Sequence, residues 1–266
     1  MTADAIGRGI ALRAEATDAI IGAGVERAVI GNCIYEAVET DAERTQFHRV
    51  TIGMTPNGDR VPSQKAAIKV YVHGANTTVG LEGAPFHTIV NSCCATPRTD
   101  SAQTTIIVDA PGFTLINAEV GVRLTDDSQD FYSDPGATHF LVYLTKDATD
   151  ARIGIDRSTS AIYLSDPMNN TVLVATDAPN TVITNAVLGL DPVDCSTDRV
   201  FESAVRFAAG SNNSRFGTDG SPNRTYVANS LGSGVHILSH NVTVANFAVS
   251  VLPVLGSTIS CRSTHV

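Results

Sequence analysis

The sequence predicts an all-β chain folded as a single-stranded parallel β-helix, a β-solenoid of about six coils, with an N-terminal α-helical cap. One short strand motif recurs: DAPGFTLINAEVGV (109–122) returns as DAPNTVITNAVLGL (177–190) and SHNVTVANFAVSV (239–251). A Gly or Asn follows each repeated apolar pair at 37-, 37-, 31-, 32- and 29-residue intervals, at Gly80, Asn117, Gly154, Asn185, Gly217 and Asn246. Repeats of 20–50 residues indicate stacked solenoid units.

The composition agrees with a folded β-rich chain. Hydrophobic residues make up 43% of the 266 residues and charged residues 17%, while Trp is absent. The length suffices for one large domain with a sizeable core. The net charge of −9 and the lack of a Lys/Arg cluster exclude a nucleic-acid partner held by phosphate contacts.

Residues 1–45 are predicted to form the cap. Ile6, Ile10, Ile20, Ile21 and Val25 recur at roughly helical spacing, which predicts a helix or helical hairpin over about residues 3–30. This segment lacks the basic start and continuous apolar run of a signal peptide or membrane span. Such a helix would cover the first exposed coil edge.

Residues 46–252 are predicted to form the coils, with three short strands in each. Stacking closes the hydrogen bonds between coils and buries the inward Val, Ile and Leu side chains. Asn and Gly suit the corners because both adopt left-handed backbone conformations. A β-sandwich with turns every 8–12 residues is the alternative. The regular spacing and the in-phase DAP turns favour the solenoid.

The remaining segments are predicted to lie outside this core. The tail, residues 253–266, is expected to cover the last coil. The longest departures from the repeat, at 125–137 and 190–200, are expected to protrude as loops from one side of the stack.

Four stretches resemble coils of the pectin methylesterases. NTTVGLEGAPFHTIVNS (76–92) resembles a coil in which a Gly-Glu-Gly type turn leads to a Thr-Ile strand. SAQTTIIVDAPGFTLINAEV (101–120) resembles the next coil, in which a Gly-Phe turn leads into a strand closing on Asn. With 140–164 and 226–238, the resemblance spans about residues 60–250. It implies the right-handed parallel β-helix of the pectin lyase-like superfamily.

The motifs that carry the esterase chemistry are missing. Family members have a Gln-Asp-Thr-Leu run, an Asp-Phe-Ile-Phe-Gly run and a Gly-Arg-Pro-Trp run. The matching stretches here read GIDRSTSAIYL, LGLDPVDC and YVANSLGSG, which keep only Asp191 and Asp194. Such an esterase needs a nucleophilic carboxylate, a carboxylic acid and a cation. We therefore expect the fold without the activity: no catalytic residue, no cofactor and no metal site.

Two acidic loops allow other chemistry. Asp126, Asp127, Asp130 and Asp134 are oxygen ligands of the kind that Ca²⁺ takes, but they lack calcium-loop spacing, and a solvated turn is the preferred interpretation. Paired carboxylates among Asp191, Asp194 and Asp198 would suit glycosidic hydrolysis if they faced each other. Candidate aromatic platforms for a sugar are few: Phe131, Tyr132 and Tyr226.

Histidines and cysteines show no metal-binding spacing. His236 and His240 are four residues apart, but their segment has a strand–turn–strand pattern, so a metal site is not expected there. We interpret the five cysteines as small buried apolar side chains whose spacing implies no particular disulfide. They are Cys33, Cys93, Cys94, Cys195 and Cys261.

The leading hypothesis for function is a non-catalytic structural protein of a virion, spike or cell-surface assembly. Its expected partners are further copies of itself or other assembly proteins, with no nucleic acid and no membrane span. We expect it in the cytoplasm before assembly and on a virion or extracellular surface afterwards. The alternative is a polysaccharide-binding or polysaccharide-active protein that uses a groove beside loops 125–137 and 190–200, with Asp191 or Asp194 as the acid.

Overall fold

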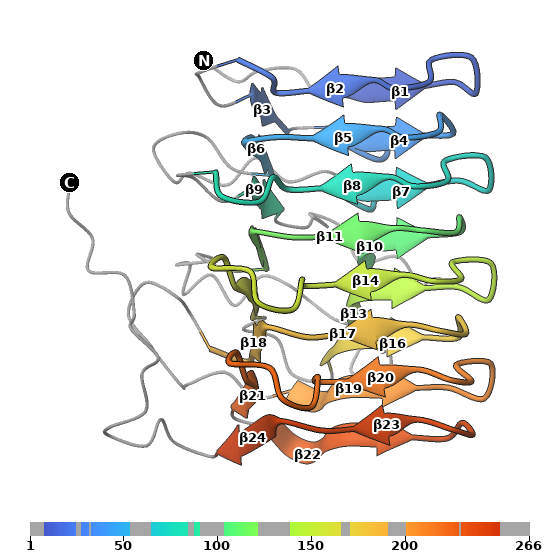
Figure 1. Ribbon diagram of the computed structural model, residues 1–266. Helices are drawn as coiled ribbons and strands as arrows, with labels where there is room; N and C mark the ends of the chain where they lie inside the picture. The colour runs from blue at the N-terminus through green and yellow to red at the C-terminus, as the bar shows by residue number, and fades with distance from the viewer. Residues whose placement is uncertain are drawn as a thin grey trace.

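The strands of the chain stack into three parallel sheets, as the computed structural model in Figure 1 shows. The structure describes residues 8–24, 28–31, 33–53, 65–84, 88–90, 104–121, 139–165, 171–190, 201–228 and 230–250. In these residues every strand pairs in parallel with its counterpart in the preceding or following layer. We call each three-strand layer a coil, and the described residues form eight of them.

Each coil contributes one strand to each sheet. The first sheet contains β1 (Ile10–Leu12), β4 (Val38–Thr40), β7 (Ile68–Val70), β10 (Thr104–Val108), β13 (His139–Leu144), β16 (Thr171–Thr176), β19 (Phe201–Phe207) and β22 (Ser230–Ile237). The second contains β2 (Ile20–Ile21), β5 (Gln46–Phe47), β8 (Thr78–Val79), β11 (Thr114–Leu115), β14 (Arg152–Ile153), β17 (Val182–Ile183), β20 (Arg215–Phe216) and β23 (Thr243–Val244). The third contains β3 (Ala28–Ile30), β6 (Val50–Ile52), β9 (Thr88–Val90), β12 (Ala118–Val120), β15 (Ile162–Leu164), β18 (Ala186–Leu188), β21 (Thr225–Ala228) and β24 (Phe247–Ser250).

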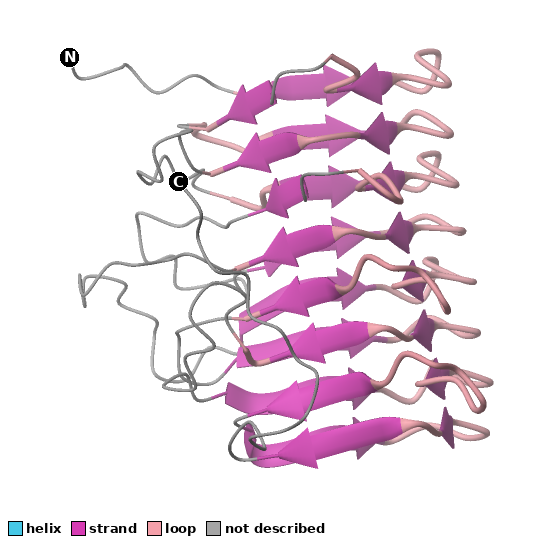
Figure 2. Cartoon of the chain, turned by 60° about the vertical axis from the view of Figure 1, so that its left-hand side comes forward, coloured by secondary structure: helices cyan, strands magenta, loops and turns pink. Residues whose placement is uncertain are grey.

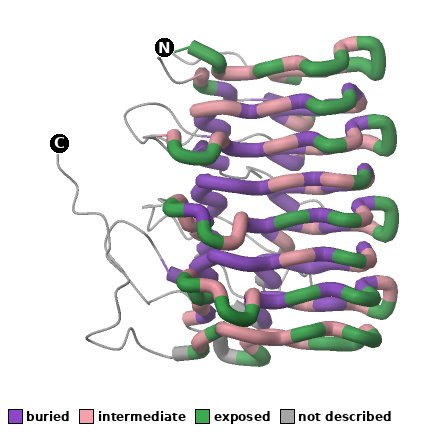
Figure 3. Tube along the Cα trace, in the orientation of Figure 1, coloured by how far each residue is buried: buried purple, intermediate pink, exposed green. Residues whose placement is uncertain are grey.

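Inward side chains from the three sheets form one continuous core. In the second sheet, Phe47, Leu115 and Phe216 occupy one inward register column and are completely buried. Figure 3 shows that the strands of the inner coils are mostly buried and that exposed residues gather on the turns. A single coil could not bury these side chains, so the stack is the unit of stability.

The turn between the first and second strand of each coil alternates in length. It has seven residues in coils 1, 3, 5 and 7 and five in coils 2, 4, 6 and 8, as in 71–77 and 109–113. The corner between the second and third strand alternates as well, with six or eight residues in odd coils and two in even coils. The repeating unit of the solenoid is therefore a pair of coils. The turns between the first and second strands project together along one edge of the stack (Figure 2).

A column of left-handed residues supports the first turn. The residue two positions before the second strand has a positive φ in every described coil. In coils 1 to 7 the N–H of this residue donates to a carbonyl of the next coil, that of the residue just before the equivalent position, at 2.8–3.4 Å. These residues are Asp18, Arg44, Asn76, Gly112, Asp150, Asn180, Asn213 and Asn241. Asn, Asp and Gly dominate because they tolerate this conformation best.

The structure corrects two expectations. Ile10–Leu12, Ile20–Ile21 and Ala28–Ile30 are the three strands of coil 1, and the described residues contain no helix, so the predicted helical cap is not found there. The described residues form eight coils where about six were expected, because coils 1 and 2 turn on Gly22 and Arg49, and Arg49 did not match the Gly/Asn pattern. The expected boundary at residue 45 falls inside coil 2. The tail, 253–266, lies outside the described residues.

Candidate functional site

The outer face of the first sheet gathers charged and tyrosine side chains in two register rows. One row runs through Glu39, Lys69 and Tyr143, which occupy equivalent positions in β4, β7 and β13. The second row lies two residues further along each coil and includes Tyr71, Asp109 and Asp177. We call these six residues the paired face.

Three contacts on the paired face repeat one diagonal. Each joins a first-row side chain to the second-row side chain of the next coil. The Tyr71 hydroxyl donates to Glu39 Oε1 at 3.3 Å, and the Tyr143 hydroxyl donates to Asp177 Oδ2 at 3.3 Å. The Lys69 ammonium donates to the Asp109 carboxylate. The polar groups therefore tie coils 2–3, 3–4 and 5–6 together along the axis.

The environment of the two tyrosines keeps them protonated. Burial, followed by the negative charges of Glu39 and Glu36, raises the pKa of Tyr71. Burial and the Asp177 carboxylate raise the pKa of Tyr143. A tyrosine that serves as a general base needs the opposite shift. Both phenols are therefore suited to donating structural hydrogen bonds.

The N-terminal end of this face adds a small cationic cluster. Arg8 Nε contacts Glu39 Oε2 at 2.8 Å, and its guanidinium lies 5.1 Å from the Tyr35 ring centroid. Lys65 Nζ lies 5.0 Å from the same ring. Tyr35, before β4 of coil 2, thus makes cation–π contacts with Arg8, before β1 of coil 1, and with Lys65, before β7 of coil 3.

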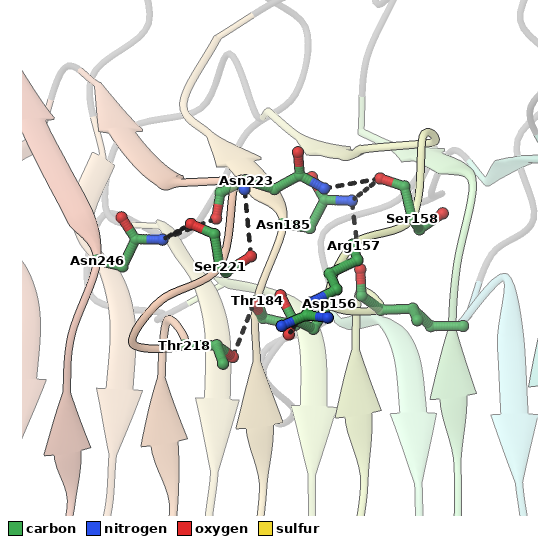
Figure 4. A network of polar contacts seen from close by, with 10 residues as sticks. Asp156, Arg157, Ser158, Thr184, Asn185, Thr218, Ser221, Asn223 and Asn246 are labelled. Carbon is green, nitrogen blue, oxygen red and sulfur yellow. Dashed lines mark hydrogen bonds and ion pairs between the residues drawn. The ribbon is translucent and has the colours of Figure 1, made fainter.

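The second-to-third-strand corner carries a polar network that spans coils 5 to 8 (Figure 4). Asn185 Nδ2 in coil 6 donates to the carbonyls of Ser158 at 3.0 Å and Ser160 at 3.2 Å in the coil 5 loop. Asn223 Nδ2 in the coil 7 loop donates to the same Ser158 carbonyl at 2.8 Å. Asn246 Nδ2 in coil 8 donates to Ser221 and Asn223 carbonyls at 2.8 and 3.1 Å. The amides hold each long odd-coil corner in place.

The same arrangement occurs earlier in the stack. Asn117 Nδ2 in coil 4 donates to the carbonyls of Leu81 and Ala84 in the coil 3 corner, at 2.9 and 3.1 Å. In coil 2, Arg49 takes the position of Asn, and its Nη1 donates to the Gly24 carbonyl at 3.3 Å. The amide or guanidinium group thus satisfies carbonyls that the long corners leave without strand partners.

The third sheet carries a buried acid on its outer face. Glu119 is completely buried and pairs in register with Ile89 and Tyr163. Thr51, Ile89 and Val187 occupy the same outward row and are also buried. The Glu119 carboxyl therefore lies in the same row as these buried side chains. In the paired face, by contrast, only Glu39 is buried and the other five side chains are partly exposed.

Most sequence-predicted site residues lie outside the described residues. These are Asp126, Asp127, Asp130, Asp134, Phe131 and Tyr132 of the first acidic loop, and Asp191, Asp194 and Asp198 of the second. Their proximity is therefore untested. Tyr226 is described: it lies half-buried on β21 beside Val187 and Ala248, so it is a strand residue and not a loop residue.

Metal-binding constellations are not found in the described part of the chain. There, no group of three or more His, Cys, Asp or Glu side chains converges on one point. His236 lies on β22 and His240 in the following turn. Cys33 is buried, and its Sγ lies 3.5 Å from the Gly31 carbonyl oxygen, while the other four cysteines fall outside the described residues.

The sequence interpretation overlooked the paired face. Its signal was available, because the in-phase DAP turns contain Asp109 and Asp177 at equivalent positions. The partners Lys69 and Tyr143 stand on neighbouring strands that are 40 and 34 residues away. Only the coil register identifies such diagonal neighbours.

In the described ranges no helix is long and apolar enough to cross a membrane. Comparison of the chain with models of known protein families, with curated proteins and with solved structures finds no match.

Proposed function

We propose that this chain is a non-catalytic structural protein, a rigid β-helical rod within a virion, spike or surface assembly. One observation carries the proposal: two sets of polar side chains on the described surface bond along the solenoid axis, between coils. The three diagonals of the paired face and the Asn-held corners are of this kind.

These contacts between coils suit a rigid rod better than a catalytic site. Catalytic groups need perturbed pKa values that suit proton transfer or attack near neutral pH. The tyrosines of the paired face are shifted away from that range, and Lys69 is paired with Asp109. Repeated bonds between adjacent coils instead add nearest-neighbour stability, which solenoids need along their whole length.

A polysaccharide panel tests the proposal. Purified full-length chain is incubated with methyl-esterified pectin, polygalacturonate and neutral glucans, and methanol, unsaturated ends and reducing ends are measured. We expect rates equal to those of Asp191→Asn and Asp194→Asn variants and of a buffer blank. Turnover by the wild-type chain above that blank would overturn the proposal, and its loss in either variant would assign the acid.

A further inference from the structure

Both end coils of the described solenoid have uncharged strands. The strands of coil 1 read IAL, II and AVI, and those of coil 8 read SLGSGVHI, TV and FAVS, without Asp, Glu, Lys or Arg. Five of the six inner coils carry charged strand residues, such as Glu39, Lys69 and Arg215, and coil 6 does not. These end strands are the edges of all three sheets. Proteins usually protect free edges with charges or proline, and an uncharged apolar edge promotes pairing with another chain.

The same ends expose apolar side chains. Phe247 and Val249 point inward, in register with the buried Thr225 and Val227, yet they are 41% and 56% exposed, since coil 8 is the last coil that the described residues form. In the described residues, six of the nine exposed large hydrophobics lie in coil 1 or coil 8: Ile20, Val29, Ile237, Leu238, Phe247 and Val249.

We propose that coil 8 of one copy stacks on coil 1 of a second copy, head to tail. This inference deepens the proposed structural function and rests on it. Continuing the observed register places Ile237 beside Leu12, Val244 beside Ile21 and Phe247 beside Ala28 of the second copy. The large ring of Phe247 would meet the small Ala28 side chain, and apolar positions would face apolar positions in all three columns.

The alternation of odd and even coils also fits this contact. The described residues form four complete pairs of coils, so a junction between coil 8 and coil 1 joins an even coil to an odd one. The same junction occurs inside the chain, where the odd-coil corner glycine donates to the even coil: Gly80 to Phe47 O and Gly154 to Leu115 O, both at 2.8 Å. Gly22 is the equivalent donor on coil 1, and Val244 O is the equivalent acceptor on coil 8.

The contact would use two different surfaces and would not close on itself. Such heterologous contacts produce open filaments when repeated. Residues 230–250 contain no Asp, Glu, Lys or Arg, so no like-charge repulsion arises from coil 8 at neutral pH.

Blocking one end at a time tests the proposal. Val249→Lys places a charge on coil 8 at an exposed site. Ala11→Pro removes an N–H from the free edge of β1. The Ile10 N–H and the Leu12 carbonyl both bond to coil 2, and backbone groups of successive strand residues point to opposite sides, so the Ala11 N–H points away from coil 2. Val72→Lys is the matched control, because Val72 is also 56% exposed but lies in a coil 3 turn. Sedimentation velocity over a 100-fold concentration range gives the mass, and circular dichroism with thermal melting confirms folding.

The wild-type chain and Val72→Lys should grow in mass with concentration. Each end variant should remain a monomer, and an equimolar mixture of the two should form dimers and nothing longer, because one free head and one free tail remain. A wild-type monomer at every concentration, as expected if residues 251–266 cover coil 8, would overturn the proposal. Assembly that both end variants retain would do so too. Either outcome leaves the proposed function standing, which the polysaccharide panel tests separately.

Discussion

The corner glycines of the odd coils are constrained by the coil that follows. Gly154 has φ of 86°, and a Cβ there would lie 1.7 Å from the Thr184 carbonyl oxygen. Gly22, Gly80 and Gly217 meet carbonyls of the next coil in the same way, at 1.6–1.9 Å. Gly220 has a similar φ of 70° but no neighbour within 4 Å. Comparing Gly154 with Gly220 therefore separates the cost of a left-handed backbone from the cost of steric overlap with the next coil.

Gly154→Ala should therefore be far more harmful than Gly220→Ala. Both carry the left-handed backbone penalty of roughly 1–2 kcal/mol. The clash at position 154 should bring its total loss to about 3 kcal/mol or more. Urea unfolding measures both losses. Equal losses would show that the coils do not approach each other at this corner.

Asn185 tests the amide network at the corner. Asn185→Gly keeps the left-handed conformation but leaves the carbonyls of Ser158 and Ser160 without its amide, so we expect a loss of about 1–3 kcal/mol. Asn241→Gly is the control, because Asn241 is exposed and its amide reaches only Asn213 Oδ1, at 3.4 Å. That variant should change the free energy of unfolding by less than about 0.5 kcal/mol. A larger loss for the control would contradict the assignment.

These corner residues were also the most predictable part of the fold. Gly80, Asn117, Gly154, Asn185, Gly217 and Asn246 were identified from the sequence as repeat anchors. Their strict alternation reflects the clash that excludes a side chain from every second corner. What the sequence did not reveal is the partner of each residue, because the Asn amides reach carbonyls in loops of the preceding coil and the glycines face carbonyls of the following coil.

At the level of elements, the second-sheet strands are too short to predict from periodicity. Each has two residues, so an alternating pattern cannot develop. In coil 1, Ile10, Ile20 and Ile21 stand at intervals that also suit a helix, which is why a helical cap was expected. Pairing with the strands of coil 2 decides the conformation, and this tertiary contact is invisible to local patterns.

The first coils should respond most to acid. Burial, and then the charge of Arg49, lowers the pKa of His48 from its usual 6.5. The hydrogen bond from Arg44 lowers the pKa of Asp18. Burial would raise the pKa of Asp41, but hydrogen bonds from His73 outweigh it and lower that pKa. All three groups lie in coils 1 and 2.

Stability should therefore fall in two steps as the pH decreases. Below pH 6.5 the unfolded chain protonates His48 more readily than the folded chain, which favours unfolding. The aspartate contributions disappear only below pH 3.8, through their lowered folded pKa values. Unfolding at pH 7.5 and 5.0 checks the first step: His48→Asn should lose less stability over this interval than the wild type. An identical loss would exclude His48 as its cause.

At the scale of the whole molecule, the proposed structural function rests on the polar contacts between neighbouring coils. The solenoid class could be predicted, since repeats reveal stacking directly. The in-phase Asp109 and Asp177 were visible in the sequence, but the contacts of the paired face could not be predicted, because the partners meet only after the coils are in register. The acidic loops 125–137 and 190–200, which the sequence interpretation emphasised, contribute only Leu190 to the described residues. The contacts that support the proposed structural role therefore come from the coils.

Cryo-electron microscopy of the wild-type chain at high concentration tests this account most directly. Eight coils at about 4.8 Å each give one chain a length of about 38 Å along the axis. We expect unbranched rods one β-helix wide, whose axial repeat is close to that length and whose sheets run unbroken across each junction. Separate single particles, closed rings or side-by-side bundles with capped ends would contradict it.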